Sequence, residues 1–95
     1  MNLVWTLRAK IDRKDIREYI GGDDPAAAMK LDELFGAMAE RLVAHPRLGR
    51  LGRLAGTREL VIHRSYILVY RPVGDTVQVL RLLHAGRKWP RGLDV

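Results

Sequence analysis

The residue types best suited to bind an anion lie together near the end of the chain. Arg87, Lys88 and Arg91 flank Trp89. Cations beside an indole can hold a phosphate while the ring stacks on a base or on a protein surface. The alternative is that Trp89 packs on the core while the charges stay solvated. The sequence alone supports the two roles equally.

A second set of basic side chains occupies the middle of the chain. Arg47, Arg50 and Arg53 recur at every third position of a glycine-containing stretch, a spacing that suits phosphate contact or simple solubility. Arg58 and Glu59 follow as neighbours, which on a strand point to opposite faces. They are candidates to orient a partner phosphate. Cross-strand charge pairs are common, however, and the alternative is that Glu59 pairs with an arginine of the adjacent strand.

Arg81 and His84 lie in and just after an apolar run, VLRLL. An arginine is almost never buried without a partner, so we expect Arg81 to pair with Glu59 or to face a ligand groove. Histidine side chains can exchange a proton under physiological conditions, so His84 is a candidate proton donor or acceptor. A turn or capping role is the more common one for a lone histidine.

Positive charge is concentrated in the second half of the chain. Residues 41–95 carry eleven Lys and Arg against three acidic residues, whereas residues 1–40 carry six basic and eight acidic residues. The net charge of +6 therefore understates a strong asymmetry between the halves. Such asymmetry predicts nucleic acid or an acidic protein segment as the partner.

Several classes of site are excluded by composition. The absence of Cys removes disulfides, thiolate zinc sites and cysteine nucleophiles, and suits a reducing cytosol. The three His lack metal-ligand spacing, so we expect no metal site, and no cofactor is predicted. Charged residues interrupt residues 1–19, which argues against a signal peptide and a membrane span. We expect one cytoplasmic domain over residues 1–95.

The elements that position these side chains follow from local patterns. We predict a strand over residues 3–8, a helix from about residue 9 to a left-handed cap at the glycines 21–22, and a helix from Pro25 to about residue 44. Asp24 and Pro25 are the start signal of the second helix. Its Met29, Phe35 and Met38 are predicted core residues. The two helices form an α-hairpin.

The second half is predicted to form strands. After a bent, glycine-rich loop come three segments rich in β-branched and aromatic residues, over residues 57–64, 65–72 and 76–83. Tyr66 and Tyr70 lie on one face of the middle strand, and at least one is expected in the core. The fold class is therefore α+β, with an N-terminal strand, an α-hairpin and a three-stranded antiparallel meander on which the helices pack.

Several phrases, in this order and spacing, resemble the RelE/ParE superfamily of toxins from bacterial type II toxin-antitoxin modules. They are IREYI, DDPAAA, HPRLGRLGR, GTRELV, YILVYR and VLRLLHAGRKWP. The resemblance covers nearly the whole chain. It implies a small basic toxin that is held inactive by a cognate acidic antitoxin, with growth inhibition and plasmid stabilisation as expected outcomes.

The resemblance implies two possible activities. RelE-like members cleave mRNA on the ribosome with basic side chains, and Arg58, Arg81, His84 and Arg87 are the candidates here. At two positions where that pattern has basic residues, however, this chain has Leu60 and Ile67. Neither can transfer a proton or cancel charge on a phosphorane.

ParE-like members lack the same residues and are described as poisons of DNA gyrase that act by binding. GTREL and LRLLH look more like that branch. The hypothesis is therefore a gyrase-binding toxin and not an enzyme, with a ribosome-dependent mRNA endoribonuclease and a non-toxic binding protein as alternatives. The candidate target-binding residues are Arg50, Arg53, Arg58, Arg81, Arg87, Lys88 and Trp89.

Overall fold

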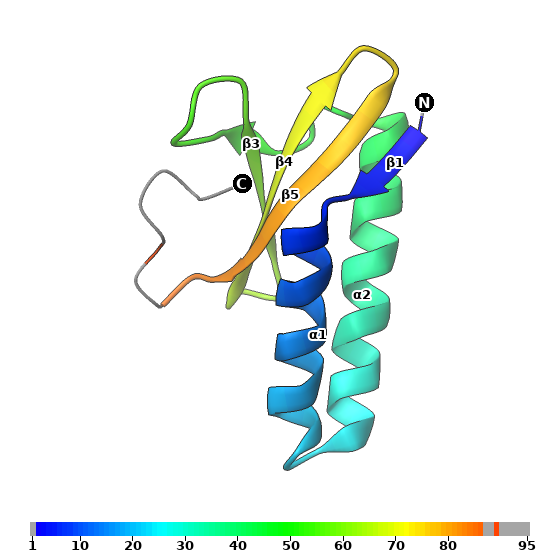
Figure 1. Ribbon diagram of the computed structural model, residues 1–95, viewed down its shortest axis with the longest axis vertical. Helices are drawn as coiled ribbons and strands as arrows, with labels where there is room; N and C mark the ends of the chain where they lie inside the picture. Colours follow the sequence, from blue (N-terminus) through cyan, green and yellow to red (C-terminus); the bar gives the residue numbers. More distant parts are fainter. Residues whose placement is uncertain (1, 87–88, 90–95) are drawn as a thin grey trace.

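The structure, a computed structural model, describes residues 2–86 and Trp89 of the chain (Figure 1). Its elements are β1 (Asn2–Trp5), α1 (Leu7–Gly21), α2 (Pro25–Ala44), β2 (Arg50–Leu51), β3 (Arg58–Ile62), β4 (Tyr66–Val73) and β5 (Thr76–His84). The predicted α+β class, α-hairpin and antiparallel meander are confirmed. The short strand β2, which the glycine-rich sequence predicted as a loop, is an addition.

The sheet has the order β1-β5-β4-β3-β2. Strand β1 is parallel to β5, and the other neighbours are antiparallel. Because β1 pairs only with the first part of β5, from Thr76 to Val79, the remaining edge of β5 has no partner strand in the described sheet. Helix α1 lies along that edge instead, as its contacts with β5 show. Thr6 Oγ1 donates to Leu80 O at 3.1 Å, and Leu82 N donates to Asp12 Oδ2 at 3.0 Å.

The helix ends are set by side-chain caps. Thr6 Oγ1 accepts from Ala9 N at 3.2 Å, which starts α1 two residues before the predicted position. Asp24 accepts from Ala27 N at 3.0 Å, and this confirms the predicted start of α2. The predicted left-handed glycine cap is wrong. Gly22 has φ −61° and ψ −35°, and the turn is closed by its amide, which donates to Glu18 O.

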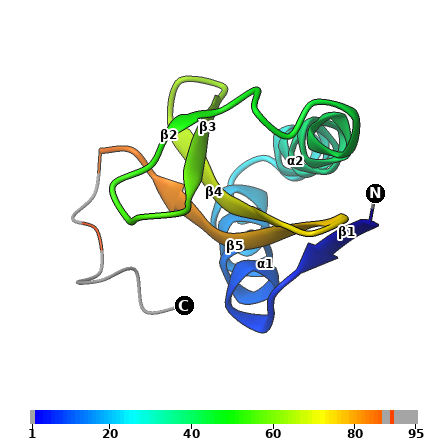
Figure 2. The ribbon, with the colours of Figure 1, turned by 90° about the horizontal axis from the view of Figure 1, so that it is seen from above.

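The main core fills the space between the helices and one face of the sheet (Figure 2). Phe35, Leu68 and Tyr70 are at most 1% exposed there, and Tyr66 packs edge-on against Phe35 with ring centroids 5.4 Å apart. Both tyrosines of β4 are buried, as expected for at least one. Successive residues of a strand point to opposite faces. A smaller cluster therefore covers the other face, formed by Ile67 and Val69 with Leu54, Leu83 and Trp89.

The helical hairpin keeps some apolar side chains at its surface. Met29 is 63% exposed, so its predicted place in the core is wrong, whereas Phe35 is buried and Met38 packs at the core's margin. Figure 1 shows the hairpin extending past the strands at its tip, where there is no sheet to cover it. In the described part of the chain, no helix is long and apolar enough to cross a membrane.

Candidate functional site

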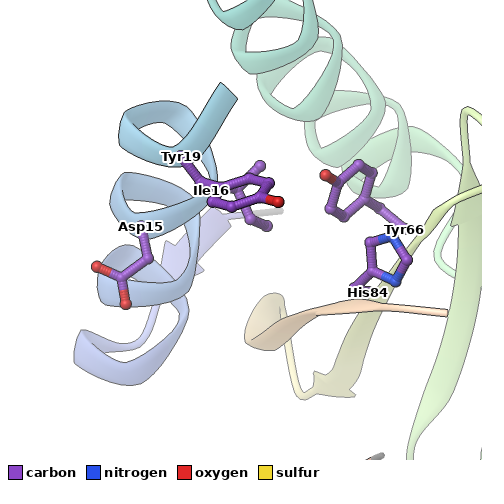
Figure 3. Close-up of a pocket in the computed structure, with 5 residues that line it drawn as sticks. All are labelled: Asp15, Ile16, Tyr19, Tyr66 and His84. Carbon is purple, nitrogen blue, oxygen red and sulfur yellow. The ribbon is translucent and has the colours of Figure 1, made fainter. Parts of the chain in front are cut away.

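A groove separates the tip half of the α-hairpin from the ends of β4 and β5. It consists of two pockets of about 400 and 450 Å³ that share Tyr66 and His84. In the first pocket, Ile16 and Tyr19 of α1 face Tyr66 across the gap (Figure 3). The second is lined by Ile20, Ala27, Lys30, Leu31, Leu34, His63 and Ser65. The groove is thus mostly apolar, with polar groups where the strands end.

Two polar side chains of the groove, Tyr66 and His84, are in contact with each other. The Tyr66 and His84 rings meet edge-on, with centroids 5.3 Å apart and an interplanar angle of 86°. His84 Nδ1 accepts from Gly86 N at 3.0 Å, so the neutral ring carries its proton on Nε2. The Asp15 carboxylate points away from both rings (Figure 3). His84 has the turn contact expected of a lone histidine, and its catalytic role stays a prediction.

The turn between β3 and β4, at the mouth of the groove, has an unusual backbone. His63 and Arg64 have φ of 52° and 63°, which is the left-handed region that glycine favours. Ser65 N donates to His63 O at 2.6 Å and closes the turn. Left-handed conformation costs about 1 kcal/mol for a residue with a Cβ. Sequence reasoning missed these two residues because the turn contains no glycine to mark it.

Arg81 is buried in an ion pair with α1. Its Nε lies 2.8 Å from Asp12 Oδ2 and its Nη2 lies 3.0 Å from Oδ1, and the arginine is only 5% exposed. The expected pairing with Glu59 is wrong, because β4 lies between β3 and β5 and separates the two side chains. Arg81 as a catalytic or target-binding residue stays a prediction, and its burial disfavours that role. The sequence signal for its partner was an aspartate at a core-facing position of α1.

Glu59 instead anchors the segment that carries two of the predicted target-binding arginines. Its carboxylate accepts from Arg53 N at 2.9 Å and from Arg50 Nη2 at 3.2 Å, while its side chain is 2% exposed. Arg50 and Glu59 are also cross-strand partners of β2 and β3. The predicted pairing of Glu59 with an arginine on an adjacent strand is thus confirmed. Both arginine side chains remain more than half exposed, at 57% and 59%.

Arg58 and Tyr70 hold the same segment from the other side. Arg58 Nη1 donates to Gly49 O at 2.8 Å. The Tyr70 hydroxyl donates to Pro46 O at 2.7 Å and accepts from Gly49 N at 2.9 Å. Burial raises the pKa of Tyr70, although the bond from Gly49 and the charge of Arg58 oppose this effect. Arg58 is half-buried, so only part of its guanidinium is accessible to a partner.

Trp89 packs against the sheet, which is one of the two roles that the sequence left open, and its role in binding a partner stays a prediction. It packs beside Ile67 and Val69 on the face of the sheet away from the helices, and Arg53 stacks on its ring at 3.6 Å from the centroid. One cation is therefore already held by the indole. The predicted site residues Arg87 and Lys88, together with their neighbour Arg91, lie outside the described residues.

Leu60 and Ile67 occupy the positions where the RelE-like pattern implies basic side chains. Leu60 packs against the main core, and Ile67 is 4% exposed in the smaller cluster. Both are ordinary packing residues on the two faces of the sheet. Within residues 2–86 and Trp89, no group of three or more His, Asp or Glu side chains could hold a metal ion.

The family model and the similar proteins of known name are all described as toxins. Residues 3–89 match the family described as ParE toxin of type II toxin-antitoxin system, parDE. Y4kP of Sinorhizobium fredii, which is named as a toxin, is 40% identical over 90 residues, covering 94% of this chain and 93% of its own. Toxin RelE2 of Caulobacter vibrioides is 38% identical over 85 residues, covering 90% and 96%.

Solved structures share the fold. A chain of the chromosomal ParDE TA system from P. aeruginosa superposes with a TM-score of 0.80 at 27% identity, covering 88% of this chain and 95% of that one. The YoeB/ParE toxin from Agrobacterium tumefaciens has a TM-score of 0.60 at 22% identity, covering 88% and 98%, which shows the fold alone. The chain therefore belongs to the ParE toxin family of type II toxin-antitoxin systems, within the RelE/ParE superfamily.

Proposed function

We propose that this toxin inhibits DNA gyrase by binding it, without bond chemistry of its own, and that a cognate acidic antitoxin neutralises it. The observation that carries the proposal is the packing of Leu60 and Ile67, which places hydrocarbon where a RelE-like nuclease needs basic groups. Cleavage of a phosphodiester requires proton transfer and charge cancellation, and neither side chain supplies them.

The remaining cations support a binding role. Arg58 is bonded to a loop carbonyl and Arg81 to Asp12, so two of the four nuclease candidates are occupied in holding the fold together. Arg50, on β2, and Arg53, two residues after β2, have side chains that are more than half exposed. A surface of this kind attracts an acidic partner and speeds its association.

The proposal is tested by following macromolecular synthesis after the toxin is induced in bacterial cells. Labelled thymidine and labelled leucine, added to parallel samples, report DNA and protein synthesis. A gyrase inhibitor is expected to lower thymidine incorporation first, while leucine incorporation continues. Cells that carry the gene without inducer are the control. Leucine incorporation that falls first would contradict the proposal.

A second candidate function, ribosome-dependent mRNA cleavage, is favoured by one observation. Tyr66 and His84, two side chains able to exchange protons, lie together in a pocket of about 400 Å³. If the toxin cleaves mRNA through this groove, His84→Gln would abolish growth arrest while leaving the fold intact. For a gyrase-binding toxin that makes its contacts through Arg50 and Arg53, His84→Gln is expected to leave growth arrest unchanged.

A further inference from the structure

We propose that residues 47–53, the arginine-leucine loop, form a preorganised docking surface for an acidic, leucine-bearing peptide segment of a partner protein. The buried hydroxyl of Tyr70 is the group that preorganises this surface. The natural partner would be the antitoxin, and only that identification rests on the proposed function. The surface itself is argued from its own contacts.

The loop sequence follows a three-residue repeat of arginine, leucine and glycine. Arg-Leu-Gly occurs twice and Arg-Leu once more, from Arg47 to Leu54. A Cβ on Gly49 would lie 2.8 Å from Glu59 O and from Tyr70 Cε1, and one on Gly52 would collide with Thr57. The glycines are therefore the points where the loop backbone rests on the rest of the molecule.

Side chains beneath the loop bind its backbone at several points. Tyr70, at 0% exposed, bonds to both Pro46 O and Gly49 N, and Arg58 bonds to Gly49 O. Glu59, at 3% exposed, accepts from Arg53 N. A loop held in this way loses little conformational entropy when a partner binds. Rigidity at an exposed basic loop is what a docking surface needs, and solubility alone does not explain it.

The loop presents leucine and arginine together to solvent. Leu51 is 78% exposed and Leu48 is 42% exposed, while the side chains of Arg50 and Arg53 are 57% and 59% exposed. Strand β2, which contains Leu51, is the last strand of the described sheet, so its outer edge is open to an added strand. The surface thus offers backbone, apolar and cationic contacts within a few residues.

These features favour an acidic peptide over nucleic acid. Arginine forms paired hydrogen bonds with carboxylates, and leucine side chains of a peptide can cover Leu48 and Leu51. A nucleic acid would gain from exposed aromatic rings on which bases stack, and residues 47–53 contain none. The nearest indole, Trp89, is half-buried and already carries Arg53 on its face.

The surface is tested with the full chain and a fluorescein-labelled peptide of alternating glutamate and leucine, with Kd read from fluorescence anisotropy. Leu51→Ser and Arg47→Glu should each raise Kd by about tenfold. The matched controls are Val73→Ser, at a site that is 48% exposed on β4, and Arg64→Glu in the β3–β4 turn. They should leave Kd within about twofold, since charges act over about 8 Å at physiological salt.

Tyr70→Phe tests the preorganising role, because it removes the hydroxyl that bonds to the loop and keeps the buried ring. In Tyr70→Phe, Kd should rise about fivefold at a temperature where circular dichroism shows the chain fully folded. Amide hydrogen exchange of Gly49 reports the loop directly, and in the unaltered chain it should be slower than that of Arg47. An unprotected Gly49 amide, or an unchanged Kd in folded Tyr70→Phe, would overturn the role of Tyr70.

Three outcomes would overturn the docking surface itself. The first is that the peptide does not bind detectably, and the second is that neither Leu51→Ser nor Arg47→Glu changes its Kd. The third is that a short DNA duplex binds more tightly than the peptide and that this binding depends on Arg47. These assays contain neither gyrase nor ribosomes. A failed docking surface is therefore distinguishable from a failed proposal about the cellular target.

Discussion

At the scale of single residues, the contact between Asp12 and Arg81 ties the first helix to the sheet. The two side chains are 14% and 6% exposed and are joined by two short bonds, and Asp12 also accepts from Leu82 N. A buried charge that loses its partner keeps its desolvation cost without compensation. The pair is therefore expected to matter for stability far more than the surface ion pairs.

Asp12→Asn tests this expectation. It should lower the free energy of unfolding by about 3 kcal/mol, because the Asp12 carboxylate no longer offsets the buried charge of Arg81. Urea denaturation measures the change. Glu18→Gln is the control, since its pair with Lys14 is 3.8 Å long with both side chains more than 60% exposed. A loss in Asp12→Asn no larger than that in Glu18→Gln would refute the assignment.

The ionisation of Asp32 is expected to make the stability of the folded chain depend on pH. Burial alone would raise its pKa, but hydrogen bonds and charge from Arg13, together with Arg17, outweigh burial and hold the pKa below the ordinary value of 3.8. A lowered carboxyl pKa contributes stability that is present above 3.8 and is lost as the pH falls through the folded value.

The prediction compares urea midpoints near neutral pH and well below 3.8. The unaltered chain should lose more stability on acidification than Asp32→Asn, which lacks the titrating group. Asp23→Asn, at an exposed turn position, should behave like the unaltered chain. Identical acid sensitivity in Asp32→Asn and the unaltered chain would show that the arginines do not hold Asp32 ionised.

At the scale of elements, local sequence signals predicted most of the helices and strands. They did not predict contacts between residues that are far apart in the sequence. Asp24 and Pro25 placed the start of α2 correctly, since a cap and a first-turn proline act within a few residues. Strand β2 was missed because two residues carry no pattern, and β3 alone defines them. Arg81 was assigned the wrong partner because Asp12 lies 69 positions away in sequence.

The β3–β4 turn gives the prediction at this scale. Arg64→Gly should raise the free energy of unfolding by about 0.5 to 1 kcal/mol, because glycine adopts the left-handed conformation without strain. The same change at Arg41 in α2 should lower it by about 1 kcal/mol, as expected for glycine in a helix. Thermal denaturation of both variants decides the point. Equal destabilisation would show that Arg64 is unstrained.

At the scale of the whole molecule, the two halves of the chain occupy different places in the fold. The α-hairpin covers one face and one edge of the sheet (Figure 2), while β2 and the residues on either side of it carry the exposed Arg47, Arg50 and Arg53. The charge asymmetry visible in the sequence thus corresponds to a location in the fold. Which arginines stay available was not predictable, because Glu59, Gly49 O and Asp12 engage them through tertiary contacts.

We propose that this toxin acts on gyrase by binding. The most direct test is supercoiling of relaxed plasmid by purified gyrase with micromolar toxin, run beside an mRNA cleavage assay on translating ribosomes. Inhibited supercoiling with intact mRNA is the predicted result. Unaffected supercoiling with cleaved mRNA would contradict the claim and establish the nuclease in its place.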